Sequence, residues 1–272
     1  MVDDIRDIAA YYDQSVAAEH ARLEQHPLEY DLTWRYLHQY LPPSGTILEV
    51  GAATGRYTLP LCQAGYAVTA VDLSPALLTE CRRRLAAEHV TDRARLVVAD
   101  ARDLRAVTAT DFNAVLLMGP LYHLVVEADR RQALRQAVER LRPGGVLVSV
   151  FLSRPGVIGD LLKRTPAWIE HDEEVRSLVE HGRRPEDQPR GGFRGYFATV
   201  PEIVPLHEAL GIATVVLAGV EPAIGADEDS YRILQPAHRA RWLDLLFAVS
   251  ADPSTIGASR HLLYIGRKGA DA

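Results

Sequence analysis

A glycine-containing run and a distant acid have the spacing of a nucleotide site. The run Gly51-Ala52-Ala53-Thr54-Gly55 follows the apolar stretch 47–50. Glycine adopts backbone dihedrals that other residues avoid, and without a Cβ it lets the backbone approach a ligand closely. Asp72 stands 21 residues after Gly51, where an acid that ends the second strand hydrogen-bonds ribose hydroxyls in nucleotide-binding α/β folds. These residues predict a site for a nucleotide-containing cofactor.

The glycine spacing disfavours a nicotinamide dinucleotide as that cofactor. The dinucleotide fingerprint is G-x-G-x-x-G. Here the glycines are four residues apart, and Ala53 stands between them. An NAD-dependent oxidoreductase therefore remains the less favoured alternative.

Alternating strands and helices position these residues. Apolar runs predict five strands, at 47–50, 66–71, 95–99, 111–118 and 146–152, with helices between them. Ser74 and Pro75 are the cap and first residue expected of the helix after the second strand. Strict alternation of strands and helices predicts a parallel sheet with right-handed crossovers.

The remaining segments are predicted to flank this core. Residues 1–41 form an N-terminal helical arm or lid, in which Pro27 ends one helix, and residues 42–152 form the cofactor-binding core. Residues 153–198 form a helical cap inserted over the site, and residues 199–272 complete the sheet through strands at 213–220 and 260–266 and helices at 201–210 and 231–249.

Several motifs together resemble the class I S-adenosylmethionine (SAM) methyltransferases. Glu49, Gly51 and Gly55 match the family's first motif, E/D-x-G-x-G-x-G, and Ala53 replaces its middle glycine. Asp72, Asp100-Ala101 and Arg142-Pro-Gly-Gly145 follow in the family's order, so the resemblance covers Thr46 to Leu152. It implies a Rossmann-like sheet of seven strands in the order 3-2-1-4-5-7-6, with the last strand antiparallel and helices on both faces. Tyr11-Tyr12-Asp13 and the run 119–124 look like a bacterial subgroup that methylates small molecules.

The resemblance also implies how S-adenosyl-L-methionine is held. Asp72 would bind the ribose, the adenine would lie beside Leu73 and between Asp100 and Ala101, and the methyl group would point toward Met118 and Gly119. The full set of cofactor-binding residues that we expect is Glu49, Gly51, Ala52, Ala53, Gly55, Tyr57, Asp72, Leu73, Asp100, Ala101, Met118, Gly119, Tyr11 and Arg22.

Two residues are candidates for catalysis. His123 follows the fourth strand, and an imidazole titrates near neutrality, so it could serve as a general base; it could equally bind a backbone carbonyl or line the cofactor pocket. Tyr12 could close over the sulfonium cation, or it could belong to ordinary helix packing. Arg22 could hold a carboxylate, with a surface salt bridge as the alternative.

Composition and one motif indicate which classes of partner this protein is not expected to bind. The 272 residues carry a net charge of −6, whereas nucleic-acid binders usually have a basic face. The run Gly119-Pro120-Leu121-Tyr122 lacks the Asn or Asp with which nucleobase methyltransferases hold an exocyclic amine. We therefore expect no nucleic-acid partner. No apolar run is long enough to cross a bilayer, so we expect a cytoplasmic protein with no membrane partner, either a monomer or a homodimer.

These observations predict an enzyme that transfers the methyl group of SAM in-line to an oxygen, nitrogen or activated carbon of a small molecule, leaving S-adenosyl-L-homocysteine. The alternatives are a peptide or protein methyltransferase and a SAM-binding enzyme with non-methylating chemistry. The acidic run His171–Glu174 is interpreted as a solvated helix face, and no metal is expected.

Overall fold

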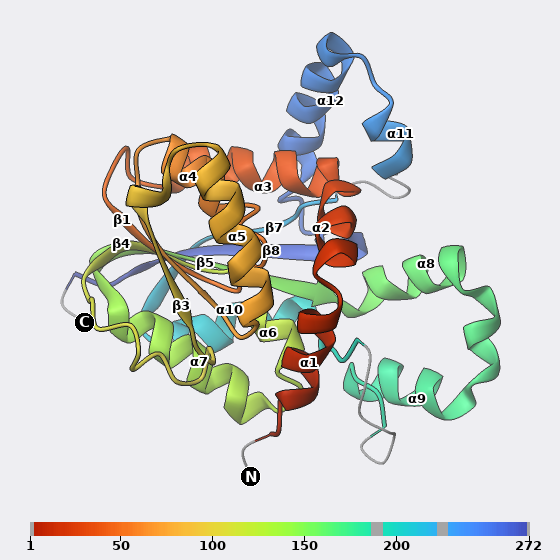
Figure 1. The fold of residues 1–272 in the computed structure, drawn as a ribbon. Coiled ribbons are helices and arrows are strands. Elements are labelled where there is room, and N and C mark those ends of the chain that lie inside the picture. The colour runs from red at the N-terminus through yellow and green to blue at the C-terminus, as the bar shows by residue number, and fades with distance from the viewer. Residues whose placement is uncertain (1–2, 186–192, 222–227, 271–272) are drawn as a thin grey trace.

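A central sheet organises the molecule (Figure 1). The computed structural model describes residues 3–185, 193–221 and 228–270, so parts of the predicted arm, cap and C-terminal segment lie outside the described residues. The strands are β1 (Thr46–Val50), β2 (Ala67–Asp72), β3 (Ala94–Val98), β4 (Phe112–Leu117), β5 (Leu141–Ser153), β6 (Phe197–Ala198), β7 (Ile212–Gly219) and β8 (His261–Lys268).

The strand order matches the predicted order. The sheet runs β3-β2-β1-β4-β5-β8-β7, and β8 is antiparallel to both of its neighbours while β1 to β5 are parallel. An eighth strand, β6, pairs only with the end of β5. The sequence did not predict β6, because two residues are too few to produce an alternating pattern.

Helices cover both faces of the sheet (Figure 1). One apolar core joins the sheet to α7 (Glu127–Arg140) and α10 (Val200–Glu208). The other joins it to α3 (Pro27–Tyr40), α4 (Thr58–Gln63), α5 (Pro75–Ala87) and α12 (Pro236–Val249). Neighbouring strand residues enter opposite cores, as Ile47 and Leu48 do on β1, because successive side chains of a strand point to opposite faces.

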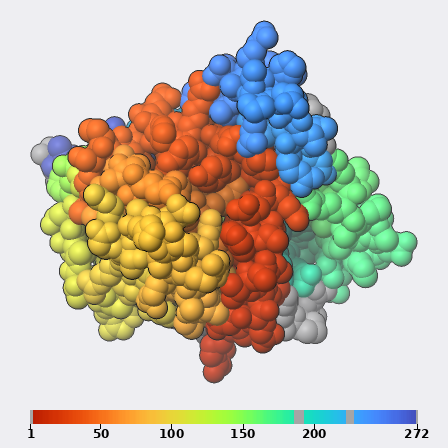
Figure 2. All heavy atoms as spheres, turned by 45° about the horizontal axis from the view of Figure 1, so that its top comes forward, coloured from red at the N-terminus to blue at the C-terminus, as the bar shows by residue number. Residues whose placement is uncertain are grey.

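The N-terminal arm lies against α5. It consists of α1 (Arg6–Gln14), α2 (Val16–Glu24) and the longer α3, and Figures 1 and 2 show α1 directly beside α5. The Asp13 carboxylate accepts a hydrogen bond from the Ser74 hydroxyl and one from the Ala76 amide. One prediction was wrong here: Pro27 begins α3, since α2 has already ended at Glu24, and proline suits the first helical position.

The predicted insertion is helical but extends away from the sheet (Figure 1). It contains α8 (Arg154–Arg164), a short 3-10 helix (Pro166–Glu170) and α9 (Asp172–His181). The short helices α6 (Pro120–His123) and α11 (Glu228–Arg232) complete the described elements that bear on the site. Within the described ranges, no helix combines the length and apolarity needed to span a membrane.

Candidate functional site

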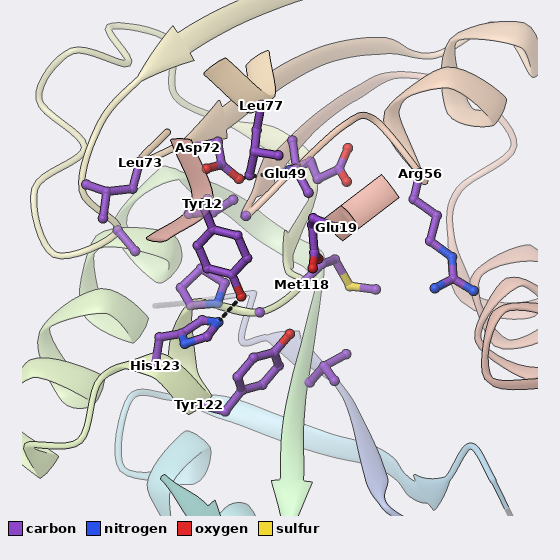
Figure 3. Close-up of a pocket in the computed structure, with 18 of the residues that line it drawn as sticks. Tyr12, Glu19, Glu49, Arg56, Asp72, Leu73, Leu77, Met118, Tyr122 and His123 are labelled. Carbon is purple, nitrogen blue, oxygen red and sulfur yellow. Dashed lines mark hydrogen bonds between the residues drawn. The ribbon is translucent and has the colours of Figure 1, made fainter. Parts of the chain in front are cut away.

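A pocket lies at the carboxyl ends of β1, β2, β3 and β4, where open α/β sheets bind ligands. The N-terminal arm borders it with Tyr12 and Glu19 (Figure 3), and Arg22 of the same arm also lines it. Its predicted lining residues are Glu49, Gly51, Ala52, Ala53, Tyr57, Asp72, Leu73, Asp100, Ala101, Met118, Gly119, Tyr12, Arg22 and His123. Residues of α8 and α9 do not line it, so these described helices of the insertion do not cover the site in the way that the sequence suggested.

Asp72 is fixed by the backbone around it. One carboxylate oxygen accepts the Ala53 amide at 2.8 Å, and the other accepts the Ser74 amide at 2.9 Å. Ala53 has a φ of 48°, a conformation that is strained for a residue other than glycine. This conformation directs the Ala53 amide at the Asp72 carboxylate. Burial raises the pKa of Asp72 to about 6. The carboxylate is therefore held rigidly at the pocket wall with lone pairs left for a ligand.

The two glycines have different roles. Gly51 has a φ of 85°, and a Cβ there would lie 2.7 Å from the Pro120 ring, so only glycine lets the turn pass beneath the loop after β4. Gly55 does not line the pocket. A Cβ on Gly55 would meet the Cys81 sulfur at 2.7 Å, so this glycine packs the turn against α5 and is not a direct cofactor contact.

Glu49 is a buried acid behind the turn. Its side chain accepts a hydrogen bond from the Thr58 hydroxyl at 2.6 Å, and burial raises its pKa to about 8. The acid is therefore largely protonated at neutral pH, and its protonated carboxyl can act as a hydrogen-bond donor toward the pocket.

The end of the pocket near Leu73 and Ala101 is mainly apolar. Leu73, Ala101 and the arm residues Ile5 and Ile8 line it. Asp100 stands at its edge, but its carboxylate already pairs with the guanidinium of Arg102 at 2.7 Å. An aromatic ring such as adenine fits the apolar walls, and Asp100 retains only part of its hydrogen-bonding capacity for the ring.

Tyr12 and His123 form one hydrogen-bonded unit (Figure 3). The Arg194 carbonyl accepts from Nδ1 of His123 at 2.9 Å, so Nε2 carries the lone pair and accepts from the Tyr12 hydroxyl at 2.8 Å. Burial and the charges of Arg22 and Arg194 lower the pKa of His123 to about 4. His123 is thus neutral at physiological pH, and an acceptor can reach its lone pair only by displacing Tyr12.

Arg22 and Tyr11 of the arm were both predicted to bind the cofactor, but they differ in whether they line the pocket. Arg22 lines the pocket and is bound through two nitrogens to Glu19, at 2.7 Å each. Tyr11 does not line the pocket; its ring packs edge-on against Tyr12 at 5.2 Å. Adjacent helical residues do not share a face, so Tyr11 and Tyr12 cannot both face the pocket.

Sequence reasoning missed several lining residues. Arg56 directly follows the glycine turn and pairs with Glu29 at 3.0 Å. Tyr122 lies within the run 119–124 that follows the fourth strand. Arg56 could have been found by extending the glycine motif by one residue, and Tyr122 by treating the whole run as part of the pocket. His26 and His261 also line the pocket, yet no local pattern marks either one.

One group of side chains could offer metal ligands. Ligand atoms of His26, Glu221 and Glu228 all lie within 4.8 Å of one another. Nη2 of Arg260, however, bonds Nδ1 of His26 at 3.0 Å and Oε1 of Glu221 at 2.8 Å. The guanidinium already supplies the positive charge that a metal ion would bring.

Comparison with known proteins identifies the domain. Residues 47–145 match the family model described as "Methyltransferase domain". The chain therefore contains a methyltransferase domain at these residues. The fold agrees, since the CcbJ methyltransferase of Streptomyces caelestis (18% identity, 90% of this chain and 91% of that one, TM-score 0.58) and a possible histamine N-methyltransferase of Thermotoga maritima (16%, 95% and 99%, 0.57) share it.

A sequence relative extends the comparison beyond the domain. Carboxy-S-adenosyl-L-methionine synthase of Aliivibrio salmonicida is 30% identical over 162 residues, which are 54% of this chain and 65% of that protein. The match thus spans less than two thirds of the relative. The methyltransferase domain family implies S-adenosylmethionine as the cofactor.

The residues present fit that cofactor. The fixed Asp72 carboxylate suits two ribose hydroxyls, and the backbone of the Gly51 turn lines the pocket beside it. The apolar end by Leu73 and Ala101 suits a base. When bound, SAM supplies a methyl group on a positively charged sulfur.

Proposed function

We propose that this protein transfers a methyl group from SAM to a small-molecule acceptor. The observation that carries the proposal is Asp72, whose carboxylate is fixed at the end of β2 by the Ala53 and Ser74 amides inside a pocket with one apolar and one polar end. A nucleoside fits the apolar end, which leaves the polar end for the acceptor.

The chain's own residues contribute mainly by alignment. Holding two reactants in line is worth up to roughly 7–11 kcal/mol, and water must be kept from the reacting groups. The arm residues Tyr12, Glu19 and Arg22 line the pocket together with residues at the ends of the strands. We propose that this arm, and not the insertion, closes the site.

Tyr12 and His123 act as a pair in this scheme. His123 accepts a hydrogen bond from the Tyr12 hydroxyl, so the tyrosine oxygen keeps its lone pairs available at the pocket wall. An oxygen so placed suits a neighbouring cation. We propose that His123 positions Tyr12, and that Tyr12 contacts the cofactor or the acceptor.

A calorimetric titration tests cofactor binding. Wild-type protein should bind S-adenosylhomocysteine and not NADH. Asp72→Ala should weaken the binding about 100-fold, because two hydrogen bonds to a charged group are lost. Asp103→Ala, which removes an exposed acid paired with Arg105, is the matched control and should not change the affinity. Unchanged affinity in Asp72→Ala would remove the basis of the proposal.

The affinity should also depend on pH. Ribose hydroxyls donate to the ionised carboxylate, so the proton and the ligand compete. Because the pKa of Asp72 is raised to about 6, affinity should fall on the order of tenfold as pH decreases from 7 to 5, measured by the same titration. The Asp72→Asn variant should lose this pH dependence; an equal dependence in both proteins would contradict the assignment.

A second candidate function is non-methylating SAM chemistry. It is favoured by the 30% identity to a protein named carboxy-S-adenosyl-L-methionine synthase. Arg22 and Arg56 place two guanidinium groups at the pocket, although each is paired with a glutamate. Mass spectrometry of the nucleoside product separates the two functions: methyl transfer yields S-adenosylhomocysteine, whereas carboxylation yields a heavier sulfonium.

A further inference from the structure

Two imidazoles from distant parts of the chain line the pocket together. His26 precedes α3, and His261 is the first residue of β8. Both are buried, with exposed fractions of 5% and 9%. His261 pairs with Leu152 of β5, so it lies at the carboxyl end of that strand, and Val150 of the same strand also lines the pocket. Neither histidine is needed for the cofactor contacts described above.

Glu221 fixes the tautomer of His261. Its Oε2 accepts from the backbone amide of His261 at 2.8 Å and from ring Nδ1 at 3.1 Å, while Arg260 donates to Oε1 at 2.8 Å. Burial would raise the pKa of Glu221, but the hydrogen bonds from His261 and the charge of Arg260 lower it. An ionised carboxylate only accepts. Nδ1 of His261 must therefore carry a hydrogen, and neutral His261 has its lone pair on Nε2.

His26 has the opposite tautomer. Arg260 donates from Nη2 to Nδ1 of His26 at 3.0 Å, and a guanidinium can only donate. Burial and the charge of Arg260 lower the pKa of His26, so the ring is neutral. Its hydrogen is therefore on Nε2. Among the residues that the structure describes, Nε2 of His26 and Nε2 of His261 make no hydrogen bond.

The two rings thus offer one donor and one acceptor. A hydroxyl group can accept from one and donate to the other at the same time. An ammonium group cannot, because it has no lone pair for the His26 N–H. A neutral amine can make both hydrogen bonds, but it needs no base before it attacks the methyl group, whereas a hydroxyl becomes more nucleophilic as it loses its proton to His261. A base held by a carboxylate through its other nitrogen is also the arrangement by which enzymes orient a catalytic histidine.

We propose that the acceptor is a small molecule with a hydroxyl group, that this hydroxyl binds between Nε2 of His26 and Nε2 of His261, and that His261 is the general base that Glu221 orients. The inference rests on the proposed methyl transfer and names its substrate class. The acceptor oxygen gives its proton to Nε2 of His261 and forms the new O–C bond. The C–S bond of the sulfonium breaks, its electron pair stays on sulfur, and the imidazolium then releases the proton to water.

Other charged groups surround this pair. Arg260 also contacts Asp160 of α8 at 3.4 Å, and Glu228 of α11 lies 3.9 Å from His26. Burial raises the pKa of Glu228 to about 7. Its titration would overlap that of a histidine, so a pH profile of activity cannot by itself identify the base. The test therefore reads the tautomers directly.

The deciding experiment is nitrogen-15 NMR of the histidine-labelled chain with S-adenosylhomocysteine bound at pH 7.5. His26→Gln and His261→Gln assign the two sets of signals. The expected result is neutral His261 with its hydrogen on Nδ1 and neutral His26 with its hydrogen on Nε2. A hydrogen on Nε2 of neutral His261, or on Nδ1 of neutral His26, would overturn the proposal.

Transfer of tritium from methyl-labelled SAM tests the chemistry. The probes are matched pairs of phenols and anilines that differ only in the hydroxyl or amino group. Phenols should be methylated in preference, and His261→Gln should lower kcat about 10²- to 10⁴-fold with an unchanged dissociation constant for S-adenosylhomocysteine. Glu221→Gln should lower kcat less, because its amide oxygen can still accept from Nδ1.

His238→Gln removes an exposed histidine of α12 and is the control that should retain wild-type kcat. Preferred methylation of the anilines, or wild-type kcat in His261→Gln, would overturn the inference while leaving methyl transfer intact. Failure of the wild-type protein to bind S-adenosylhomocysteine would instead mean that the proposed function itself is wrong.

Discussion

At the scale of single residues, the site depends on which atom of each side chain is already occupied. His123 has the position that suits a base, but its two nitrogens bond the Arg194 carbonyl and the Tyr12 hydroxyl. His261 has one nitrogen held by Glu221, and the other makes no hydrogen bond with the described residues. The sequence marked only His123 as a candidate base, and the hydrogen-bond partners in the folded chain distinguish its positioning role from the catalytic role that we propose for His261.

The Tyr12–His123 bond should be measurable as a coupling energy. Tyr12→Phe leaves a buried Nε2 without a partner and should lower the free energy of unfolding by about 1–3 kcal/mol. In a double-mutant cycle with His123→Leu, measured by urea unfolding, the coupling should be about 1 kcal/mol. Tyr11→Phe is the matched control, because Tyr11 packs on Tyr12 only through its ring, and its cycle with His123→Leu should show no coupling. A zero coupling for Tyr12 would contradict the pairing.

At the scale of elements, one residue joins the arm to the site. The Arg194 side chain pairs with Asp3 at 2.6 Å and with Asp7 at 3.0 Å, while its carbonyl holds His123. The position of α1 and the orientation of His123 are therefore set by the same segment, which is the end of the predicted insertion 153–198. Among the described residues of the insertion, this end segment contacts the site, whereas α8 and α9 do not line the pocket.

Removing this contact should loosen the arm. Arg194→Ala deletes two partly buried ion pairs, each worth about 1.5–3 kcal/mol as charged hydrogen bonds. Hydrogen–deuterium exchange of the α1 amides should therefore accelerate about tenfold or more. Arg6→Ala is the control. It removes an arginine of α1 whose side chain is 90% exposed, and it should leave the exchange of the α1 amides unchanged. Equal exchange in wild type and Arg194→Ala would show that α1 is held by other contacts.

The core elements were predictable from the sequence, and the polar end of the pocket was not. Apolar runs and glycine turns such as Gly51–Gly55 are local signals, and they located the strands and the Asp72 site, whereas the strand order came from the family resemblance. His26 and His261 are 235 residues apart in the sequence and are joined by Arg260 and Glu221. Such a cluster has no periodicity and no motif, so it becomes visible only when the arm and β8 meet in the folded chain.

At the scale of the whole molecule, different parts of the chain line the proposed cofactor and acceptor ends of the pocket. The domain at 47–145 supplies the turn and the Asp72 wall for the cofactor. Segments outside that domain, the arm and the start of β8, supply Tyr12, His26 and His261. This division explains why the domain family implies the cofactor, whereas the acceptor has to be inferred from the parts of the chain that the domain does not include.

A structure of the complex with S-adenosylhomocysteine tests this account most directly. We expect both ribose hydroxyls within hydrogen-bond distance of the Asp72 carboxylate and the adenine beside Leu73 and Ala101. The sulfur should face the end of the pocket that His26 and His261 line, with space for an acceptor between them. A ligand that lies elsewhere, or whose ribose does not touch Asp72, would contradict the account.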